Sequence, residues 1–441
     1  MKKLYTMYMC VLTAALFATG SATAQTAREE IKANRLLAGS NYLDYDHRGE
    51  TPVLTPTPKG YEPFYMSHYG RHGSRWLIGE KSYTRILEKM RKAKQQDKLT
   101  ATGLHVLQQL EEFYLTTTDR LGDLTTVGER QHHGIGQRMA HNFPEIFCST
   151  GVHIDARSTT VNRCILSMIA ECEELAAANP TAVFHNDVSE SLQYYLNQPR
   201  KGLVKAMANK AREHRNNLMK SRQAPLVMHD NIIATLFNDT QWADDSLDAA
   251  RTASALFEVA SNMQSHDTDI DLMQLFTDEE VYGQWQARNI GWYLDYGNAL
   301  IGEGALPFSQ KNLLKNIIAT ADTVTQTQAT LRFGHEVCVM PLACLLELDS
   351  CNYATDDMTT LDSHWRNYRI FPMACNIQLV FYRPVKGKKG DILVKALLNE
   401  REARLPAVTE NFPYYRWADL RRYYLDKIET FEKREKEFEE K

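Results

Sequence analysis

The chain has 441 residues, of which 43% are hydrophobic and 24% are charged, as in an ordinary globular protein. Its length predicts about two to three domains, or one large core that carries an insertion. The net charge of −4 argues against a general role at nucleic acids or membrane surfaces.

The N-terminus has the pattern of a secretory signal peptide. Lys2 and Lys3 precede an apolar run that ends near Phe17, and Ala22 and Ala24 stand in the small-x-small arrangement of a cleavage site. The run is shorter than the roughly 20 residues of a membrane span. We therefore expect residues 1–24 to be removed and the protein to be secreted or periplasmic, without membrane attachment. An uncleaved anchor is the alternative.

Strand–turn–helix units follow at both ends of the chain. The first set comprises a strand at 63–67, helices over 80–118, a strand at 152–157, a helix over 161–177 and a strand at 182–185. Amphipathic helical segments fill residues 189–304. The second set comprises a strand and helix within 329–348, strands at 376–384 and 391–399, and a solvated charged helix over 427–441.

This order predicts an α/β core with a mostly α-helical cap insertion. We expect residues 25–188 and 305–441 to form the core, with a helical insert near 80–120, and residues 189–304 to form the cap. Ligands in open α/β sheets lie beyond the carboxyl ends of the strands.

The turn "YGRHGSRW" (69–76) crowds Arg71, His72 and Arg75 around two glycines. Like charges this close repel each other unless water or an anion lies between them. Arginine offers paired donors that match phosphate oxygens, and histidine is a nucleophile at neutral pH. Gly73 would let the backbone approach the anion. The turn therefore indicates a phosphoryl site, with a solvated basic turn as the alternative.

Two further segments carry suitable groups. Arg163, in "ARSTTVNRC", stands near the start of a helix that follows a strand, where an anion is favoured; Arg157 is the alternative in the same segment. His335 and Glu336, in "RFGHEV", follow another strand and a glycine. An imidazole that binds phosphate, beside a carboxyl group that protonates a leaving oxygen, suits monoester cleavage.

These motifs, in this order, resemble those of the histidine phosphatases, in their larger acid-phosphatase and phytase-like branch. R-H-G-x-R stands at 71–75, and "LTTVGERQHHGIGQRM" (124–139) is similar to the segment L-T-x-x-G-x-x-Q-x-x-x-L-G. "GHE" (334–336) stands where H-D or H-A-E is usual. The segment 275–299 and "RCILS" (163–167) resemble multiple inositol polyphosphate phosphatases. The resemblance covers about residues 60–400 and implies a mixed central sheet flanked by helices.

The resemblance also implies the roles of the site residues. His72 is the nucleophile and forms a phosphohistidine, while Arg71, Arg75, Arg163 and His335 bind the phosphoryl oxygens. Glu336 is the proton donor, although the inositol-phosphatase pattern has its acid one position later, at Val337. No metal or other cofactor is implied, because the arginines neutralise the phosphate charge.

A basic run in the predicted cap offers a second set of candidates. Lys201, Lys205 and Arg212 would meet further phosphates of a polyanionic substrate if this helix faces the cleft; otherwise the run is a solvated helix face. His132 and His133 lack a third ligand at metal-site spacing.

The sequence thus predicts a secreted, metal-independent phosphomonoesterase that acts on small phosphorylated molecules such as inositol polyphosphates. A broad-specificity acid phosphatase for sugar phosphates or nucleotides is one alternative, and a non-catalytic polyanion-binding protein is another. Nucleic acid is not expected as a partner, and the oligomeric state is left open.

Overall fold

The computed structural model describes residues 25–440, except 48, 51 and 222–226. The predicted signal peptide, residues 1–24, lies outside this part of the chain. Among the described residues, no helix combines the length and apolar character that crossing a membrane requires.

The core is a mixed sheet, as the sequence predicted. Over the described residues it has eight strands in the order β3-β2-β4-β1-β5-β6-β7, with β8 paired to β6. The strands from β3 to β1 are parallel, and those from β1 onward are antiparallel. The strands are β1 (Tyr61–Arg71), β2 (His153–Ser158), β3 (Val183–Asp187), β4 (Thr327–Gly334), β5 (Asn376–Pro384), β6 (Leu393–Leu398), β7 (Arg401–Ala403) and β8 (Tyr415–Arg416).

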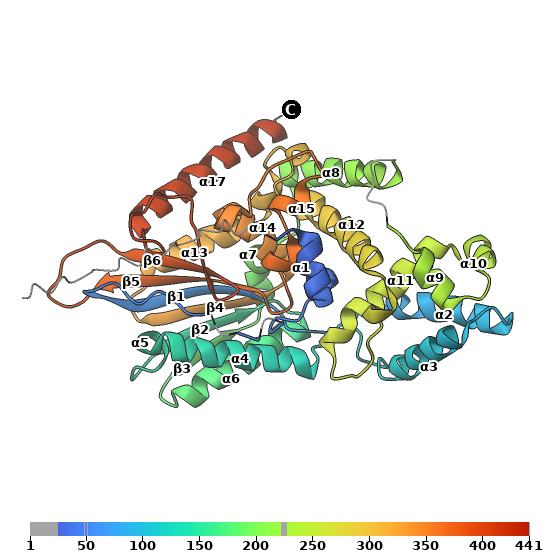
Figure 1. The fold of residues 1–441 in the computed structure, drawn as a ribbon. Helices are drawn as coiled ribbons and strands as arrows, with labels where there is room; N and C mark the ends of the chain where they lie inside the picture. The colour runs from blue at the N-terminus through green and yellow to red at the C-terminus, as the bar shows by residue number, and fades with distance from the viewer. Residues whose placement is uncertain (1–24, 48, 51, 222–226, 441) are drawn as a thin grey trace, which may run out of the picture.

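Helices cover both faces of this sheet (Figure 1). One face carries α4 (Thr126–Asn142), α5 (Pro144–Phe147) and α6 (Asn162–Ala178). The other face carries α7 (Gln193–Leu196), α13 (Lys311–Thr323), α14 (Glu336–Leu346) and α17 (Trp417–Glu439).

The remaining helices extend beyond the carboxyl ends of the parallel strands (Figure 1). They are α1 (Ala27–Ala33), α2 (Lys81–Gln95), α3 (Ala101–Leu115), α8 (Gly202–Lys220), α9 (Asp230–Leu236), α10 (Thr240–Leu247), α11 (Ala249–Asn262), α12 (Asp278–Tyr296), α15 (Leu361–His364) and α16 (Asn367–Ile370). The 3₁₀ segments are η1 (Arg35–Tyr42), η2 (Glu190–Leu192), η3 (Met263–Ser265), η4 (Met273–Leu275), η5 (Leu300–Gly302), η6 (Leu306–Gln310) and η7 (Leu348–Ser350).

One hydrophobic cluster joins α2 and α3 to α9, α10, α11 and α12. The insert near 80–120 therefore packs with much of the helical block over 189–304, whereas α8 packs against α12 and α17. The domain boundaries drawn from the sequence stay a prediction.

The C-terminal helix differs from the expectation of a solvated element. α17 begins ten residues earlier than expected, at Trp417, and buries Leu420, Tyr424, Ile428 and Phe431 on one side. These residues recur at helical spacing, which places them on one face against the core.

The sheet register places three segments at one edge. In the parallel pair β1 and β4, Arg71 lies opposite Gly334, and in β2 and β4, Ser158 lies opposite Phe333. The three strands thus end level with one another. The R-H-G-x-R turn, the start of α6 and the His335–Glu336 pair therefore follow adjacent carboxyl ends.

Candidate active site

His72 continues directly from β1 and is held by backbone hydrogen bonds. Its N–H donates to the Gly334 carbonyl at 3.0 Å, and its carbonyl accepts from the Ala374 N–H at 3.1 Å. Nδ1 of the imidazole lies 2.8 Å from the Gly73 carbonyl. Because a carbonyl only accepts, Nδ1 carries the proton and donates it, and Nε2 keeps a free lone pair.

Gly73, the residue after His72, lets the turn pack closely against α4. A Cβ atom on Gly73 would lie 2.3 Å from the Gly128 carbonyl oxygen, and one on Gly128 would lie 2.2 Å from the Ser74 carbonyl oxygen. Both distances are impossible contacts. The sequence suggested that Gly73 approaches an anion; the close approach in the structure is to α4.

Residues of α4 and α6 fix the turn. The Ser74 N–H donates to Oε1 of Gln131 at 2.8 Å, and Nε2 of Gln131 donates back to the Ser74 hydroxyl at 2.9 Å. From α6, Oγ of Ser167 accepts a hydrogen bond from the Gly73 N–H at 3.1 Å. The segments "LTTVGERQ" and "RCILS" therefore act as supports of the R-H-G-x-R turn.

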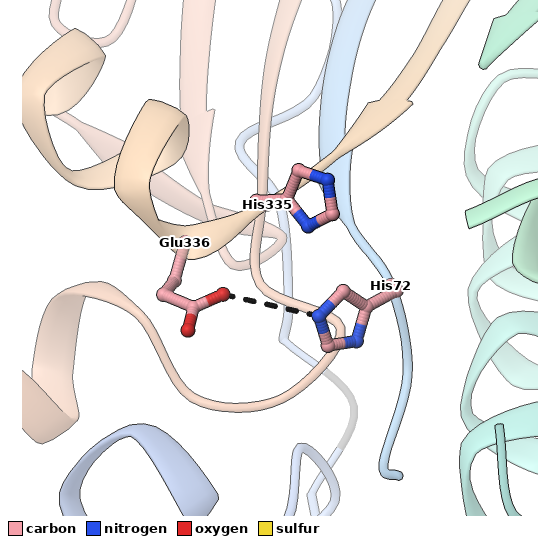
Figure 2. A group of neighbouring side chains, drawn as sticks. All are labelled: His72, His335 and Glu336. Carbon is pink, nitrogen blue, oxygen red and sulfur yellow. Dashed lines mark ion pairs between the residues drawn. The ribbon is translucent and has the colours of Figure 1, made fainter. Parts of the chain in front are cut away.

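The His335–Glu336 pair faces His72 (Figure 2). The rings of His72 and His335 are edge-on, with centroids 5.6 Å apart. Oε2 of Glu336 lies 3.9 Å from Nε2 of His72 and 3.1 Å from Nε of Arg71. These groups are all at most 8% exposed. A carboxylate thus lies beside the free nitrogen of an imidazole.

Within the described part of the chain, three guanidiniums present hydrogen-bond donors that have no protein partner. Nη1 of Arg71 donates to the carbonyls of Asn41, Phe371 and Pro372, but its Nη2 is buried without a partner. Nε of Arg75 and Nε of Arg163 are likewise buried without a hydrogen-bond partner. Buried, unsatisfied donors are costly, and the charges of these three guanidiniums all act on His72, so the group favours a bound anion.

Arg157, the alternative to Arg163, lies apart from these groups. It pairs with Asp155 at 3.5 Å and donates to the Tyr195 hydroxyl at 3.3 Å. The charge of Arg163, in contrast, acts on His72 and interacts with Glu336.

The positive field perturbs each titratable group of the site. Burial and the surrounding Arg71, Arg163 and Arg75 hold the pKa of His72 well below its ordinary value. Burial likewise lowers the pKa of His335 to about 4. Burial alone would raise the pKa of Glu336, but Arg71, Arg75 and His335 outweigh it and lower that pKa to about 2. The resting site therefore holds two neutral imidazoles and an ionised carboxylate.

His72, His335 and Glu336 also form the one group of potential metal ligands found among the described residues, with ligand atoms within 4.8 Å of one another. Three guanidiniums surround this group, and their charges oppose a bound cation while favouring an anion. The arrangement suits attack by an imidazole on a phosphoryl group.

A buried pair that the sequence analysis did not identify supports the turn from behind. Nε2 of His132 donates to the Arg71 carbonyl at 3.1 Å, and its Nδ1 lies 3.0 Å from Oε2 of Glu171. His132 was considered only as a metal ligand. Because the helix α6 that carries Glu171 is remote in sequence, no local pattern could reveal this contact.

Between described residues, no hydrogen bond or ion pair joins the basic run of α8 to His72, His335 or Glu336. Lys201 lines a surface cleft with Glu432, Glu435 and Glu439 of α17. Lys205 and Arg212 are exposed on α8. Their predicted role in substrate binding stays a prediction.

A different set of basic residues lines a cavity of about 880 Å³, which we call the basic cavity. Its cations are Arg85 and Lys89 of α2, Arg251 of α11 and Arg288 of α12. These residues come from three helices that are far apart in the sequence, so no single segment indicated the cavity.

The basic cavity adjoins the phosphoryl site. It is lined by Asn41, whose carbonyl binds Arg71, and by Tyr42, whose ring lies 5.6 Å from the Arg75 guanidinium. A third lining residue, Trp292, packs on Phe371 with ring centroids 5.0 Å apart.

Solved structures of other proteins have a fold similar to that of this chain. A multiple inositol polyphosphate phosphatase from Bifidobacterium longum, in complex with inositol hexasulfate, is 18% identical and has a TM-score of 0.68, over 83% of this chain and 93% of that chain. A phytase from D. castellii is 12% identical with a TM-score of 0.64, over 92% and 88% of the two chains. A phytase from Citrobacter braakii is 11% identical with a TM-score of 0.54, over 83% and 98%.

No curated protein matches the chain by sequence. A family profile described as histidine phosphatase superfamily (branch 2), however, matches residues 70–399. That range spans the R-H-G-x-R turn, both supporting helices and the His335–Glu336 pair. The chain therefore belongs to branch 2 of the histidine phosphatase superfamily.

Proposed function

We propose that this histidine-type phosphatase is a secreted, metal-independent phosphomonoesterase that acts through a phosphohistidine on inositol polyphosphates or similar small metabolites. The observation that carries the proposal is the free Nε2 of His72, which faces Glu336 among three guanidiniums with unused donors. A phosphate group offers acceptor oxygens to all of these donors. Secretion rests on the signal-peptide pattern of residues 1–24.

The reaction takes two steps. The lone pair on Nε2 of His72 attacks phosphorus, the bond between phosphorus and the ester oxygen breaks, and Glu336 protonates the departing alkoxide. Water then attacks the phosphohistidine, the P–N bond breaks, and the Glu336 carboxylate accepts the proton of that water. Arg71, Arg75, Arg163 and His335 bind the phosphoryl oxygens and stabilise charge in both transition states.

Glu336 must be protonated when it acts as an acid, although its pKa in the resting site is about 2. A phosphate dianion that binds between the guanidiniums cancels much of the field that lowers this pKa. Binding of substrate therefore raises the pKa of Glu336 and promotes uptake of the proton that the first step consumes.

The basic cavity supports a substrate with several phosphates. Four cations line it beside the phosphoryl site, and a substrate with one phosphate leaves them unused. The alternative of a broad acid phosphatase predicts similar kcat/KM for phytate, glucose phosphates and nucleotides. We expect kcat/KM to be higher for the polyphosphorylated substrate.

The proposal is tested by phosphate release from p-nitrophenyl phosphate in the presence of EDTA. We expect turnover by the wild type, retention of activity in His105→Ala, which removes an exposed histidine of α3, and loss of activity in His72→Ala. Wild type quenched in alkaline denaturant should also carry an acid-labile phosphoryl group that His72→Ala lacks. A protein that binds phosphate without turnover would instead be a polyanion-binding protein.

A further inference from the structure

A carboxylate, Glu258 of α11, lines the basic cavity among its cations. Its Oε1 accepts a hydrogen bond from the Ser82 hydroxyl at 3.2 Å. Among the described residues it forms no ion pair within 4.0 Å, while its charge acts on Tyr42 and Arg288. An acid at this position conflicts with a cavity designed only for phosphates, because it repels them.

The second acid of the cavity, Asp248, is different. Its Oδ2 pairs with Nε of Arg251 at 3.1 Å, and its Oδ1 accepts from the Arg251 N–H at the start of α11. Asp248 is thus neutralised locally and serves as a helix cap. Glu258 keeps a negative charge that a bound substrate would meet.

We propose that Glu258 determines which polyphosphorylated substrate the enzyme accepts. This inference rests on the proposed function. The carboxylate accepts a hydrogen bond from a free hydroxyl group of the substrate, and it repels a phosphate at the same place. The preferred substrate is therefore a partly phosphorylated polyol, with phosphates toward Arg85 or Arg288 and a hydroxyl toward Glu258. Discrimination of this kind combines an attractive contact with a repulsive one.

If Glu258 had only a structural role, that role would be to balance the charge of Arg288. That guanidinium donates to the Ser261 hydroxyl at 3.0 Å and lies 4.8 Å from the centre of the Phe257 ring. Loss of such a role would lower stability and weaken the binding of every ligand equally. It would not change the ratio of affinities for two ligands that differ in phosphorylation.

The test measures competitive inhibition of p-nitrophenyl phosphate hydrolysis, so it does not depend on turnover of the inhibitor. The two inhibitors are myo-inositol hexakisphosphate and D-myo-inositol 1,4,5-trisphosphate, which carries free hydroxyls. In Glu258→Gln we expect the ratio of the two Ki values to shift about tenfold in favour of the hexakisphosphate, because one repulsive charge is removed.

Two variants serve as controls. Glu258→Asp keeps the charge and should keep the ratio near that of the wild type. Glu88→Gln removes one negative charge from the exposed face of α2, outside the cavity, and should leave the ratio unchanged.

The possible failures are distinguishable. If the wild type does not hydrolyse the aryl phosphate, the proposed function is wrong. If it does, the inference about Glu258 is overturned by an unchanged ratio in Glu258→Gln, by an equal shift in Glu88→Gln, or by failure of both inositol phosphates to inhibit the wild type.

Discussion

Nε of Arg71 lies 3.1 Å from Oε2 of Glu336, and this carboxylate also lies 3.9 Å from Nε2 of His72. The same guanidinium therefore contacts the proposed acid and borders the phosphoryl site. When a phosphate dianion takes up the free donor of Arg71, the attraction between Arg71 and Glu336 weakens. We expect this coupling to link substrate binding to protonation of the acid.

Glu336→Gln should lower kcat/KM, which reports the first step alone, for an alkyl phosphate by about 10²- to 10⁴-fold, the usual contribution of general acid catalysis. The loss should be much smaller for p-nitrophenyl phosphate, because nitrophenolate departs without a proton. Steady-state rates on the two substrates check this. Glu213→Gln, at an exposed position on α8, should behave as the wild type. Equal losses on both substrates would contradict the role of Glu336 as an acid.

His72 should stay neutral in mildly acidic solution. Its pKa in the free protein is held well below 6.5 by burial and by the neighbouring guanidiniums. Nε2 therefore keeps its lone pair as the pH falls through 6.5, and it takes up a proton only at much lower pH. Imidazole NMR signals of the phosphate-free protein check this, with the His72 signal assigned by its absence in His72→Ala. A titration of that signal centred near pH 6.5 would contradict the prediction.

Gly73→Ala should prevent correct docking of the turn on α4, since the added Cβ would lie 2.3 Å from a backbone oxygen. We expect Gly128→Ala to have the same effect from the other side. Both variants should lose several degrees of Tm and most of their activity. Gly291→Ala is the control: this helical glycine has only Cδ of Arg215, at 3.9 Å, near its Cβ position. It should gain about 0.5–1 kcal/mol in stability from helix propensity. A normal Tm for Gly73→Ala would disprove the packing argument.

The sequence predicted those parts of the fold that depend on local pattern. The strand at 376–384 and the motif turn could be predicted because apolar runs and glycines mark them directly. The site residues at 71–75 and 335–336 follow strand ends, and parallel neighbours bring such ends together. The orientation of the imidazole and the carboxylate depends on tertiary packing, and the roles expected for these residues from the motifs stay a prediction.

The basic cavity could not be predicted in this way. Its cations come from three helices, with Arg85 and Lys89 on α2, Arg251 on α11 and Arg288 on α12, and only the packing of those helices gathers them. The basic run over 200–222 stood out in the sequence because of its local charge density, and its role in substrate binding stays a prediction. The start of α17 was missed because its apolar residues alternate with charged ones that dominate the composition.

Acid should destabilise the protein through its buried histidines. Burial lowers the pKa of His266, which packs between Trp76 and Phe113, to about 4. Between pH 6.5 and 4 the unfolded chain binds a proton at this residue and the folded chain does not, so stability falls as the pH falls. His266→Gln should reduce the drop in Tm between pH 7 and pH 4, measured by thermal melts. A pH dependence identical to that of the wild type would contradict this assignment.

His132 should act as a positioning residue for Arg71. Its Nε2 donates to the Arg71 carbonyl at 3.1 Å, and Glu171 holds the other side of the ring. His132→Leu removes the donor and leaves that carbonyl and the Glu171 carboxyl unpaired, which should cost about 1–3 kcal/mol of stability for each group. We also expect kcat to fall by about tenfold or more as the guanidinium shifts.

His132→Gln provides the decisive comparison, because its amide nitrogen can replace Nε2 as the donor to the Arg71 carbonyl. It should recover most of the lost kcat even if it does not recover all of the lost stability. His133→Gln is the matched control, since His133 contacts Glu174 on the outer side of α4 and not the turn; its kcat should be normal. Equal kcat in His132→Leu and His132→Gln would show that the histidine fills space rather than holding Arg71. The distinction matters for the phosphoryl site as a whole, because Nη2 of Arg71 is one of the three free donors that define it.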